Sequence, residues 1–367
     1  MTFQRLVVKC GTSTLTGGTT HLSPPRLVEL AQQIAHLRKT TPEVIVVTSG
    51  AVAAGRERLN LTQLPKDLPV KQMLAAIGQL RLMALYEQVF GLYGLTIAQV
   101  LLTRSDLADR RRYLNSRNTL TALLEHGVIP IVNENDTVAT EEIRVGDNDN
   151  LSALVANLID ADLLVLLTDQ AGLYTADPGH DPAAELVTDI TESDIPAALW
   201  QAAGGSANSL GTGGMLTKLQ AADLARRSGT TVVIANGSEP DVLVRLAVKE
   251  KIGTWFQPVV TSLESRKRYI LAGQPAGSIG IDAGAAQALH HGRSLLPVGV
   301  IDVSGHFERG DTIQVLNPGG REVARGIVNY ESGDLARLCR HQSAEIETIL
   351  GYTYGDEVIH RNNLILL

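Results

Sequence analysis

Several features that mark other classes of protein are scarce in this sequence of 367 residues. Cysteine occurs only as Cys10 and Cys339, which excludes a disulfide framework and a closely spaced metal-binding pair. Aromatic residues make up 4% of the chain and the net charge is −7, so neither base stacking nor bulk positive charge indicates a nucleic-acid-binding protein. No apolar run suits a signal peptide or a membrane span. We therefore expect a soluble, cytoplasmic protein.

The composition is otherwise that of a globular protein. Hydrophobic residues account for 44% and charged residues for 19%, and 34 glycines stand against 14 prolines. At ~150 residues per domain, the length favours one large domain with a smaller one, or two of similar size.

Short aliphatic runs alternate with segments of helical spacing over residues 6–236. Several runs are apolar at every position, which is typical of parallel strands covered on both faces of a sheet. The sequence therefore predicts an α/β sandwich with a mainly parallel central sheet. The predicted strands are 6–9, 44–48, 96–101, 128–132, 163–168 and 231–235.

The residues that follow these strands are the candidates for function. In doubly wound sheets the ligand site lies beyond the carboxyl ends of the strands. Helices are expected to begin at Pro24, at Asn150 and after Lys218, and another to end before Gly127.

Small residues follow the first two strands. Lys9 precedes Gly11 in a turn that suits a phosphate, although a lysine reaching solvent from a sheet edge explains it equally well. Ser49 and Gly50 precede an alanine-rich helix whose N-terminus suits a carboxylate or phosphate. An ordinary capping serine is the alternative there.

Amide and carboxylate side chains follow the fourth strand. The run from Asn133 to Asp136 comes directly after an apolar segment, where a tight turn is the simplest alternative. The run from Gly146 to Asn150 then leads into a helix that Asn150 could cap. An EF-hand loop is excluded, because Leu151 occupies its third ligand position.

Two further segments indicate nucleotide binding. Thr168 and Asp169 end the fifth strand, and Gly211 begins a glycine-rich segment that reaches Lys218. Such a loop with a terminal lysine suits a polyphosphate. It matches neither the Walker A pattern nor the dinucleotide-binding glycine pattern.

Together these motifs resemble the amino acid kinase superfamily and, within it, the glutamate 5-kinase family. The motifs in chain order are KxGTS, VTSGA, NENDTV, GDNDNLSA, LLTDQAGLYTADP and GTGGMLTK. The resemblance covers nearly the whole chain. NEND followed by GDNDNLSALVA is its most specific part, because aspartokinases, acetylglutamate kinases and UMP kinases do not carry that pair. The resemblance implies a three-layer αβα sandwich for the amino acid kinase domain.

The C-terminal segment resembles a PUA domain, a small β-rich module. The predicted organisation is a kinase domain over 1–257, a charged connector over 258–274 and a PUA-like domain with the C-terminal tail over 275–367. From residue 258 onward, ten Lys and Arg side chains stand against twelve Asp and Glu. This balance favours a structural or regulatory role for the PUA-like domain, with RNA binding as the less favoured alternative.

The resemblance implies a reaction that transfers the γ-phosphoryl group of ATP to the side-chain carboxylate of L-glutamate. The product is L-glutamyl 5-phosphate, in the first step of proline biosynthesis. A free carboxylate with a pKa of ~4.3 is already ionised at neutral pH, so no general base is required. Mg²⁺ is expected to be carried mainly by the ATP phosphates, with no side-chain ligand assigned.

The resemblance also assigns the site residues. The catalytic residues are Lys9, Lys218 and Asp149, with Asp149 orienting both lysines. The glutamate-binding residues are Ser49, Gly50, Asn133, Asp136, Asp147 and Asn148. The ATP-binding residues are Lys9, Gly11, Thr168, Asp169, Thr212, Gly213, Gly214, Met215, Leu216, Thr217 and Lys218.

The resemblance implies three kinds of partner. The small molecules are L-glutamate, ATP and proline as a feedback inhibitor. Copies of the chain itself would form a homodimer or homotetramer, and glutamate-5-phosphate reductase is the expected protein partner. Two other functions stay open: a kinase of the same superfamily with another acceptor, and a noncatalytic RNA-binding or regulatory protein.

Overall fold

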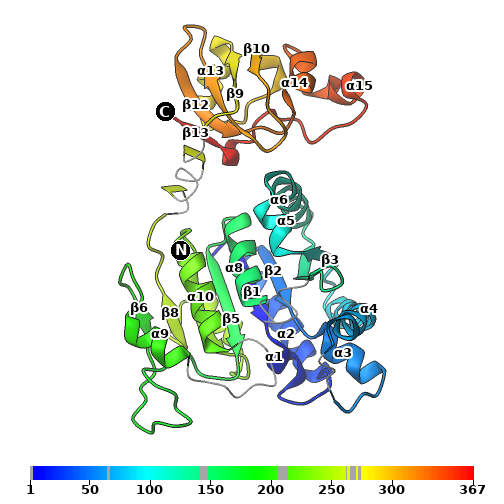
Figure 1. Ribbon diagram of the computed structural model, residues 1–367, viewed down its shortest axis with the longest axis vertical. Helices are drawn as coiled ribbons and strands as arrows, with labels where there is room; N and C mark the ends of the chain where they lie inside the picture. The colour runs from blue at the N-terminus through cyan, green and yellow to red at the C-terminus, as the bar shows by residue number, and fades with distance from the viewer. Residues whose placement is uncertain are drawn as a thin grey trace. The chain divides into compact units, whose positions relative to one another are not determined.

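The computed structural model describes residues 3–63, 67–139, 148–204, 214–261, 263–264, 270–271 and 274–367. The chain divides into two compact units (Figure 1). The first comprises Met1–Ala108 and Asn115–Ser262, and the second comprises Asp109–Leu114 and Leu263–Leu367. The sequence-based domain boundaries at residues 257 and 275 stay predictions.

The first unit is built on one sheet of mainly parallel strands. Every pair of neighbouring strands in it is parallel except β7 and β8. This arrangement confirms the predicted sheet. In spatial order the strands are β3 (Ile97–Leu102), β4 (Ile129–Glu134), β2 (Glu43–Thr48), β1 (Arg5–Cys10), β5 (Leu163–Thr168), β7 (Thr231–Asn236), β8 (Thr254–Phe256) and β6 (Asp189–Ile190).

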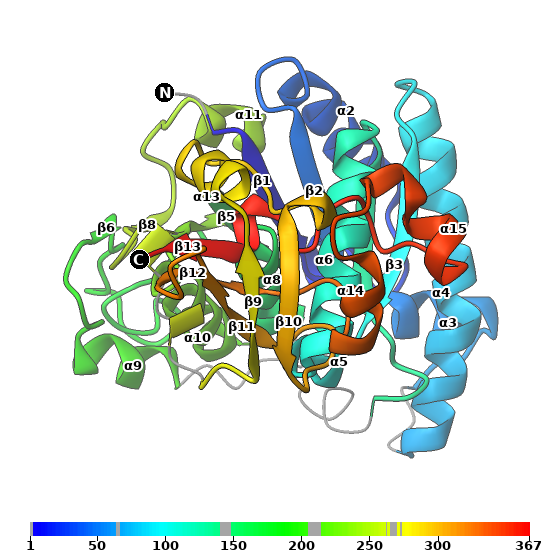
Figure 2. The same cartoon turned by 90° about the horizontal axis from the view of Figure 1, so that it is seen from above.

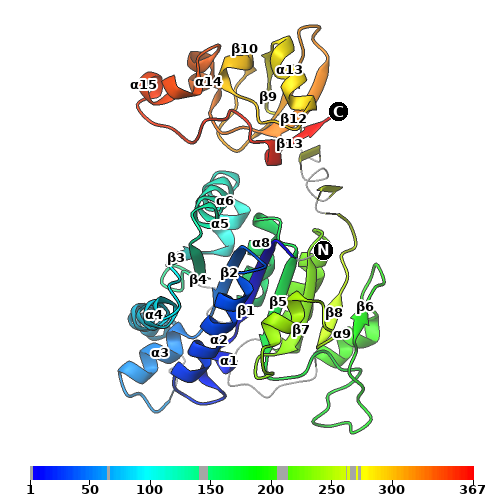
Figure 3. The same ribbon diagram turned by 180° about the vertical axis from the view of Figure 1, so that it is seen from behind.

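Helices cover both faces of this sheet. Helices α2 and α11 lie on one face and α8 and α10 on the other (Figures 2 and 3). The helices of the first unit are α1 (Thr12–Thr16), α2 (Pro24–Leu37), α3 (Ala51–Arg58), α4 (Leu68–Gly91), α5 (Arg104–Ala108), α8 (Asn148–Leu158), α9 (Ala197–Ala203), α10 (Met215–Arg226) and α11 (Val242–Ala247), and α6 (Arg110–Glu125) joins residues of both units.

The central strands have the burial that their composition predicts. All six residues of β4 and of β5 are buried, as expected for strands between two helical layers. Cys10 at the end of β1 is fully buried, and burial raises the pKa of its thiol to about 12. Cys10 is therefore a core residue.

Two predicted helix starts are wrong. Helix α8 begins at Asn148 rather than Asn150, so the polar residues expected to precede the helix form its first turn. Helix α10 begins at Met215, and Lys218 lies inside it. Gly214 has an extended backbone and accepts a hydrogen bond from Thr217 Oγ1 at 2.9 Å, so the helix starts directly after the last glycine.

Helix α4 packs against α3 at two glycines. A Cβ atom on Gly78 would lie 1.8 Å from the carbonyl oxygen of Ala51, and one on Gly55 would lie 2.0 Å from that of Leu74. Only glycine permits backbones to approach so closely. The position of α4 beside the end of β2 is therefore fixed by direct backbone contact.

The second unit has its own sheet and core. Its strands pair antiparallel except for β9 and β11, which are parallel. Residues 307–311 connect β10 to β11, and residues 317–320 lie in the turn between β11 and β12. The strand order is β10 (Val300–Gly305), β9 (Gly277–Ile281), β11 (Thr312–Leu316), β12 (Glu322–Ile327) and β13 (Leu364–Leu366), with helices α13 (Ala283–His290), α14 (Ser332–Leu338) and α15 (Ile346–Leu350) and short 3₁₀ turns at Pro297–Gly299, Ser343–Glu345 and Arg361–Asn363.

In the described part of the chain, no helix combines the length and the apolar character that crossing a bilayer would require.

Candidate active site

Strands that run parallel bring their carboxyl ends to one edge of the first sheet. In the register of the sheet, Cys10 of β1 stands opposite both Thr48 of β2 and Leu167 of β5, and Val47 of β2 stands opposite Val132 of β4. The predicted site residues that follow these strands therefore lie along one edge, where a doubly wound sheet is expected to bind its ligand.

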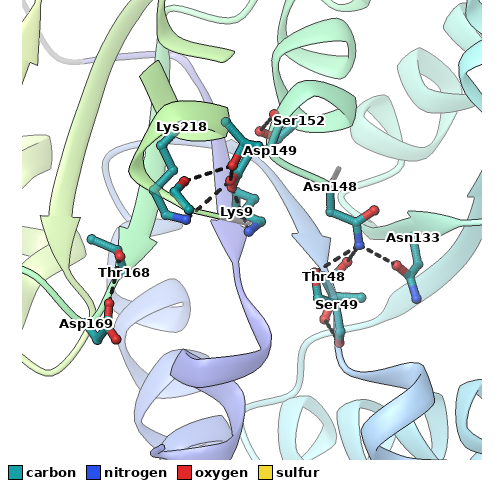
Figure 4. A network of polar contacts seen from close by, with 12 residues as sticks. Lys9, Thr48, Ser49, Asn133, Asn148, Asp149, Ser152, Thr168, Asp169 and Lys218 are labelled. Atoms are coloured by element: carbon teal, nitrogen blue, oxygen red, sulfur yellow. Dashed lines mark hydrogen bonds and ion pairs between the residues drawn. The ribbon is translucent and has the colours of Figure 1, made fainter. Parts of the chain in front are cut away.

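One group of side chains at this edge is ionic and buried. Lys9 Nζ lies 2.7 Å from Asp149 Oδ1, and Lys218 Nζ lies 3.2 Å from Asp149 Oδ2 (Figure 4). The exposed fractions are 4% for Lys9, 0% for Asp149 and 6% for Lys218. These three residues, called the lysine–aspartate cluster below, come from β1, α8 and α10.

Further hydrogen bonds hold Asp149 in place. Thr217 Oγ1 donates to Asp149 Oδ2 at 2.8 Å, and Ser152 Oγ donates to the Asp149 carbonyl oxygen at 2.5 Å. Burial acts to raise the pKa of Asp149, but the attraction of Lys9 and Lys218 outweighs it and lowers the pKa to about 2. Burial and the charge of Lys9 lower the pKa of Lys218 despite its bond to Asp149. With one carboxylate between two ammonium groups, the cluster is suited to binding an anion.

Lys9 does not reach solvent from an edge strand, which was the alternative explanation for a lysine at this position. Strand β1 lies in the middle of the sheet, between β2 and β5. A Cβ atom on Gly11 would come within 3.3 Å of Lys9 Nζ, so the glycine leaves space directly beside the ammonium group. That space is where a phosphate oxygen could approach.

A second group at the same edge is neutral. Asn148 Nδ2 lies 2.7 Å from the Thr48 carbonyl oxygen, 2.9 Å from Ser49 Oγ and 2.9 Å from Asn133 Oδ1 (Figure 4). Asn133 Nδ2 in turn donates to Gln79 Oε1 at 2.8 Å. The side chains of Ser49, Asn133, Asn148 and Gln79 are called the amide cluster below.

Sequence reasoning singled out three members of the amide cluster and missed Gln79. Gln79 lies in α4, a helix that the sequence analysis did not delimit, and it has no polar neighbour in sequence that marks a site. The one signal in the sequence is Gly78, since a glycine inside a helix often marks a close backbone contact.

The remaining predicted residues lie around these two clusters or outside the described residues. Gly50 has a φ of 95° and precedes α3, and Asp136 lies half-buried in the turn after β4. Thr168 Oγ1 donates to Asp169 Oδ1 at 3.1 Å at the end of β5. Gly214, Met215, Leu216 and Thr217 lie at the start of α10. Asp147, Thr212 and Gly213 fall outside the part of the chain that the structure describes.

The described residues contain no group of three or more His, Cys, Asp or Glu side chains that could hold a metal ion.

Comparison with known proteins places the chain in a family. The model of the amino acid kinase family matches residues 4–236, and that of the PUA domain matches residues 277–350. A glutamate 5-kinase of Photobacterium profundum is 56% identical over 99% of this chain and 96% of its own length. A glutamate 5-kinase of Herpetosiphon aurantiacus is 54% identical over 98% of both chains. Among solved structures, a UMP kinase of Bacillus anthracis is similar with a TM-score of 0.47 and 16% identity, over 71% of this chain and 98% of that one.

The relatives and the family models agree with the motifs at the sheet edge. The amino acid kinase match contains both clusters, and the PUA match lies in the second unit. The chain therefore belongs to the amino acid kinase family and, within it, to the glutamate 5-kinases, with a PUA domain at its C-terminal end.

Proposed function

We propose that the protein transfers the γ-phosphoryl group of ATP to the side-chain carboxylate of L-glutamate, the first step of proline biosynthesis. The observation that carries this proposal is the lysine–aspartate cluster beside the amide cluster, at one sheet edge of a chain from this family. The ionic cluster suits the phosphoryl group that moves, and the neutral cluster suits an amino acid that brings its own charges.

The acceptor needs no general base. A glutamate carboxylate with a pKa of ~4.3 is already a nucleophile at neutral pH, so the protein must align two anionic substrates and reduce their repulsion. Lys9 and Lys218 supply positive charge to the phosphoryl group as it moves. Asp149 acts through both lysines, because its two oxygens hold the two ammonium groups in fixed positions.

The nucleotide is held at the ends of β1 and β5 and at the start of α10. Thr168 and Asp169 follow β5, while Gly11 leaves space beside Lys9. The exposed Gly214 N-cap leads into the twelve residues of α10, whose first backbone N–H groups suit a phosphate. Thr212 and Gly213 would complete this loop.

Magnesium fits a site of this kind as part of the nucleotide complex. Mg²⁺ keeps several water ligands and usually binds through substrate phosphates and few carboxylates. Asp149 is already paired with two lysines, so we assign Asp169, which is exposed at the end of β5 and accepts from Thr168 through Oδ1, to face such an ion. Mg²⁺ would neutralise phosphate charge that the two lysines do not cover.

Glutamate is held by the amide cluster and its surroundings. Asp136 pairs with the substrate ammonium group, and Asn133 and Asn148 supply amide groups. Ser49 and Gly50 present donors at the start of α3 to a carboxylate. Asp147 belongs to the same predicted set.

Three further parts of the proposal concern regulation and organisation. Proline, an amino acid with the same carbon number as glutamate, inhibits by lowering the apparent affinity for glutamate, which a proline titration measures. The chain acts in the cytoplasm as a homodimer or homotetramer and associates with glutamate-5-phosphate reductase. Residues 1–257 form the kinase domain, 258–274 the connector and 275–367 the PUA-like domain with its tail.

A coupled assay of ADP release tests the main proposal. The reaction is run with glutamate, aspartate, acetylglutamate or UMP as acceptor, with and without Mg²⁺. We expect ADP formation that depends on glutamate and on the metal. No glutamate-dependent ADP formation, or a preference for another acceptor, would contradict it.

A further inference from the structure

A backbone hydrogen bond identifies which end of the Asn133 amide is the oxygen. Asn133 Oδ1 accepts a hydrogen bond from the backbone N–H of Glu134 at 2.9 Å, so this end of the amide must be the oxygen. The nitrogen then faces Gln79, whose Oε1 accepts from Asn133 Nδ2 at 2.8 Å. The Gln79 amide is thereby oriented as well, with its oxygen toward Asn133 and its nitrogen away from it.

The Asn148 amide is fixed in the same way from the other side. Its nitrogen donates to the Thr48 carbonyl oxygen, which can only accept, so Asn148 Nδ2 is the end that faces β2. Figure 4 shows the Asn148 oxygen directed away from Thr48 and Ser49. The amide cluster is thus a chain of defined polarity, in which Asn148 donates to Asn133 and Asn133 donates to Gln79.

The backbone of Gln79 is held rigidly beside this chain. Its neighbour Gly78 is the residue at which α4 touches α3, where an added Cβ atom would lie 1.8 Å from the Ala51 carbonyl oxygen. Ala51 directly follows Gly50 at the end of β2. The same contact that joins the two helices therefore sets how far Gln79 stands from the acceptor site.

The two ends of the Gln79 amide differ in their partners. Gln79 Nε2 is buried and has no hydrogen-bond partner among the described residues, and an unpaired buried donor destabilises a fold. An unbranched apolar side chain would remove that donor, but it would also leave the buried Asn133 Nδ2 without the acceptor that Gln79 Oε1 provides. What glutamine adds at this position is therefore the acceptor that holds the Asn133 amide.

We propose that Gln79 is a positioning residue for the acceptor substrate. Its Oε1 holds the Asn133 amide in the orientation that turns Asn133 Oδ1 toward Asn148, and so it sets the affinity for glutamate without touching the phosphoryl group. This inference rests on the proposed function, since it assumes that the amide cluster binds glutamate.

The test is Gln79→Met, with Gln88→Met as the matched control because Gln88 is exposed on the same helix. Loss of one oriented amide contact is expected to raise the KM for glutamate about tenfold, with kcat and the KM for ATP changed less than about twofold. The midpoint of thermal unfolding should change little, because the variant removes the unpaired Gln79 Nε2 donor but leaves the buried Asn133 Nδ2 without its acceptor. Gln88→Met should resemble the wild type in every measurement.

A double-mutant cycle shows whether Gln79 acts through Asn133. In an Asn133→Ala background, Gln79→Met should change the KM for glutamate less than about twofold, because the group it positions is gone. Calorimetric titration of glutamate gives the same comparison where turnover is too slow to measure.

The outcomes separate this inference from the proposed function. A wild-type enzyme that forms no ADP with glutamate overturns both. An active wild type with an unchanged KM in Gln79→Met overturns only the role of Gln79. Additive effects in the cycle, or a lower unfolding midpoint with matching losses of kcat, would show a structural role instead.

Discussion

The lysine–aspartate cluster and the amide cluster occupy one sheet edge but use opposite chemistry. The first places two ammonium groups and a carboxylate in surroundings that exclude water, whereas the second consists of amides and a hydroxyl. The charged side chains lie where a charged phosphoryl group would be transferred. The neutral amides and the hydroxyl lie where an amino acid with charges of both signs would bind. In a chain with a net charge of −7, attraction for anionic substrates must come from such local groups.

Helix α8 joins the two clusters through adjacent residues. Asn148 and Asp149 form the start of the helix, and successive helical residues point about 100° apart. Asn148 therefore reaches the amide cluster while Asp149 reaches the two lysines (Figure 4). Variants in each cluster test whether the two clusters control different steps.

The largest effect is expected from Asp149→Asn. The change leaves two buried ammonium groups without their carboxylate, which should lower the free energy of unfolding by about 3–5 kcal/mol and also lower kcat. Urea unfolding measures the stability. The control is Asp189→Asn, because Asp189 pairs with Lys251 in a solvent-exposed ion pair that should contribute less than ~1 kcal/mol. Equal losses in the two variants would contradict the role of burial.

Next in size are Lys9→Ala and Lys218→Ala. Each removes a cation that faces the moving phosphoryl group, so kcat should fall about 10²–10³-fold while the KM for glutamate changes little. Steady-state kinetics measure both constants, and Lys251→Ala at the exposed pair serves as control. Near-normal turnover in either variant would remove that lysine from the mechanism.

The Asp136→Ala variant tests the proposed glutamate-binding part of the site. Loss of the carboxylate that pairs with the substrate ammonium group should raise the KM for glutamate about 10–100-fold, with a much smaller change in kcat. Initial rates over a glutamate series at saturating ATP measure this. A fall in kcat with an unchanged KM would mean that Asp136 belongs functionally with the lysines.

Sequence reasoning located strands better than it located helix starts. Strands such as β5 are contiguous apolar runs, so the residues that follow them, including Thr168, could be placed from the sequence. The start of α8 could not, because the same Asn and Asp residues are common in turns and in first helical turns. The position of Asp149 between two lysines came from the family resemblance, since side chains from three distant segments meet there.

Gln79 could not be identified as a site residue from the sequence for a different reason. Apolar residues surround it in α4, and its role depends on a hydrogen bond to a residue 54 positions away. The close contacts between α3 and α4 at Gly55 and Gly78 bring it to the site. Long-range contacts of this kind have no local pattern that could predict them.

The smallest effect expected is the pH dependence that Asp149 alone contributes. Its pKa in the folded protein is about 2, below the ordinary value of 3.8, so its contribution to stability is present above about pH 4 and is lost as the pH falls toward 2. The difference corresponds to about 2 kcal/mol. Urea unfolding at about pH 5 and pH 3 measures the difference in the free energy of unfolding between the wild type and Asp149→Asn, and this difference should be smaller at the lower pH. An equal difference at both pH values would mean that the lysines do not hold this carboxylate ionised. The two clusters would then differ in packing rather than in charge.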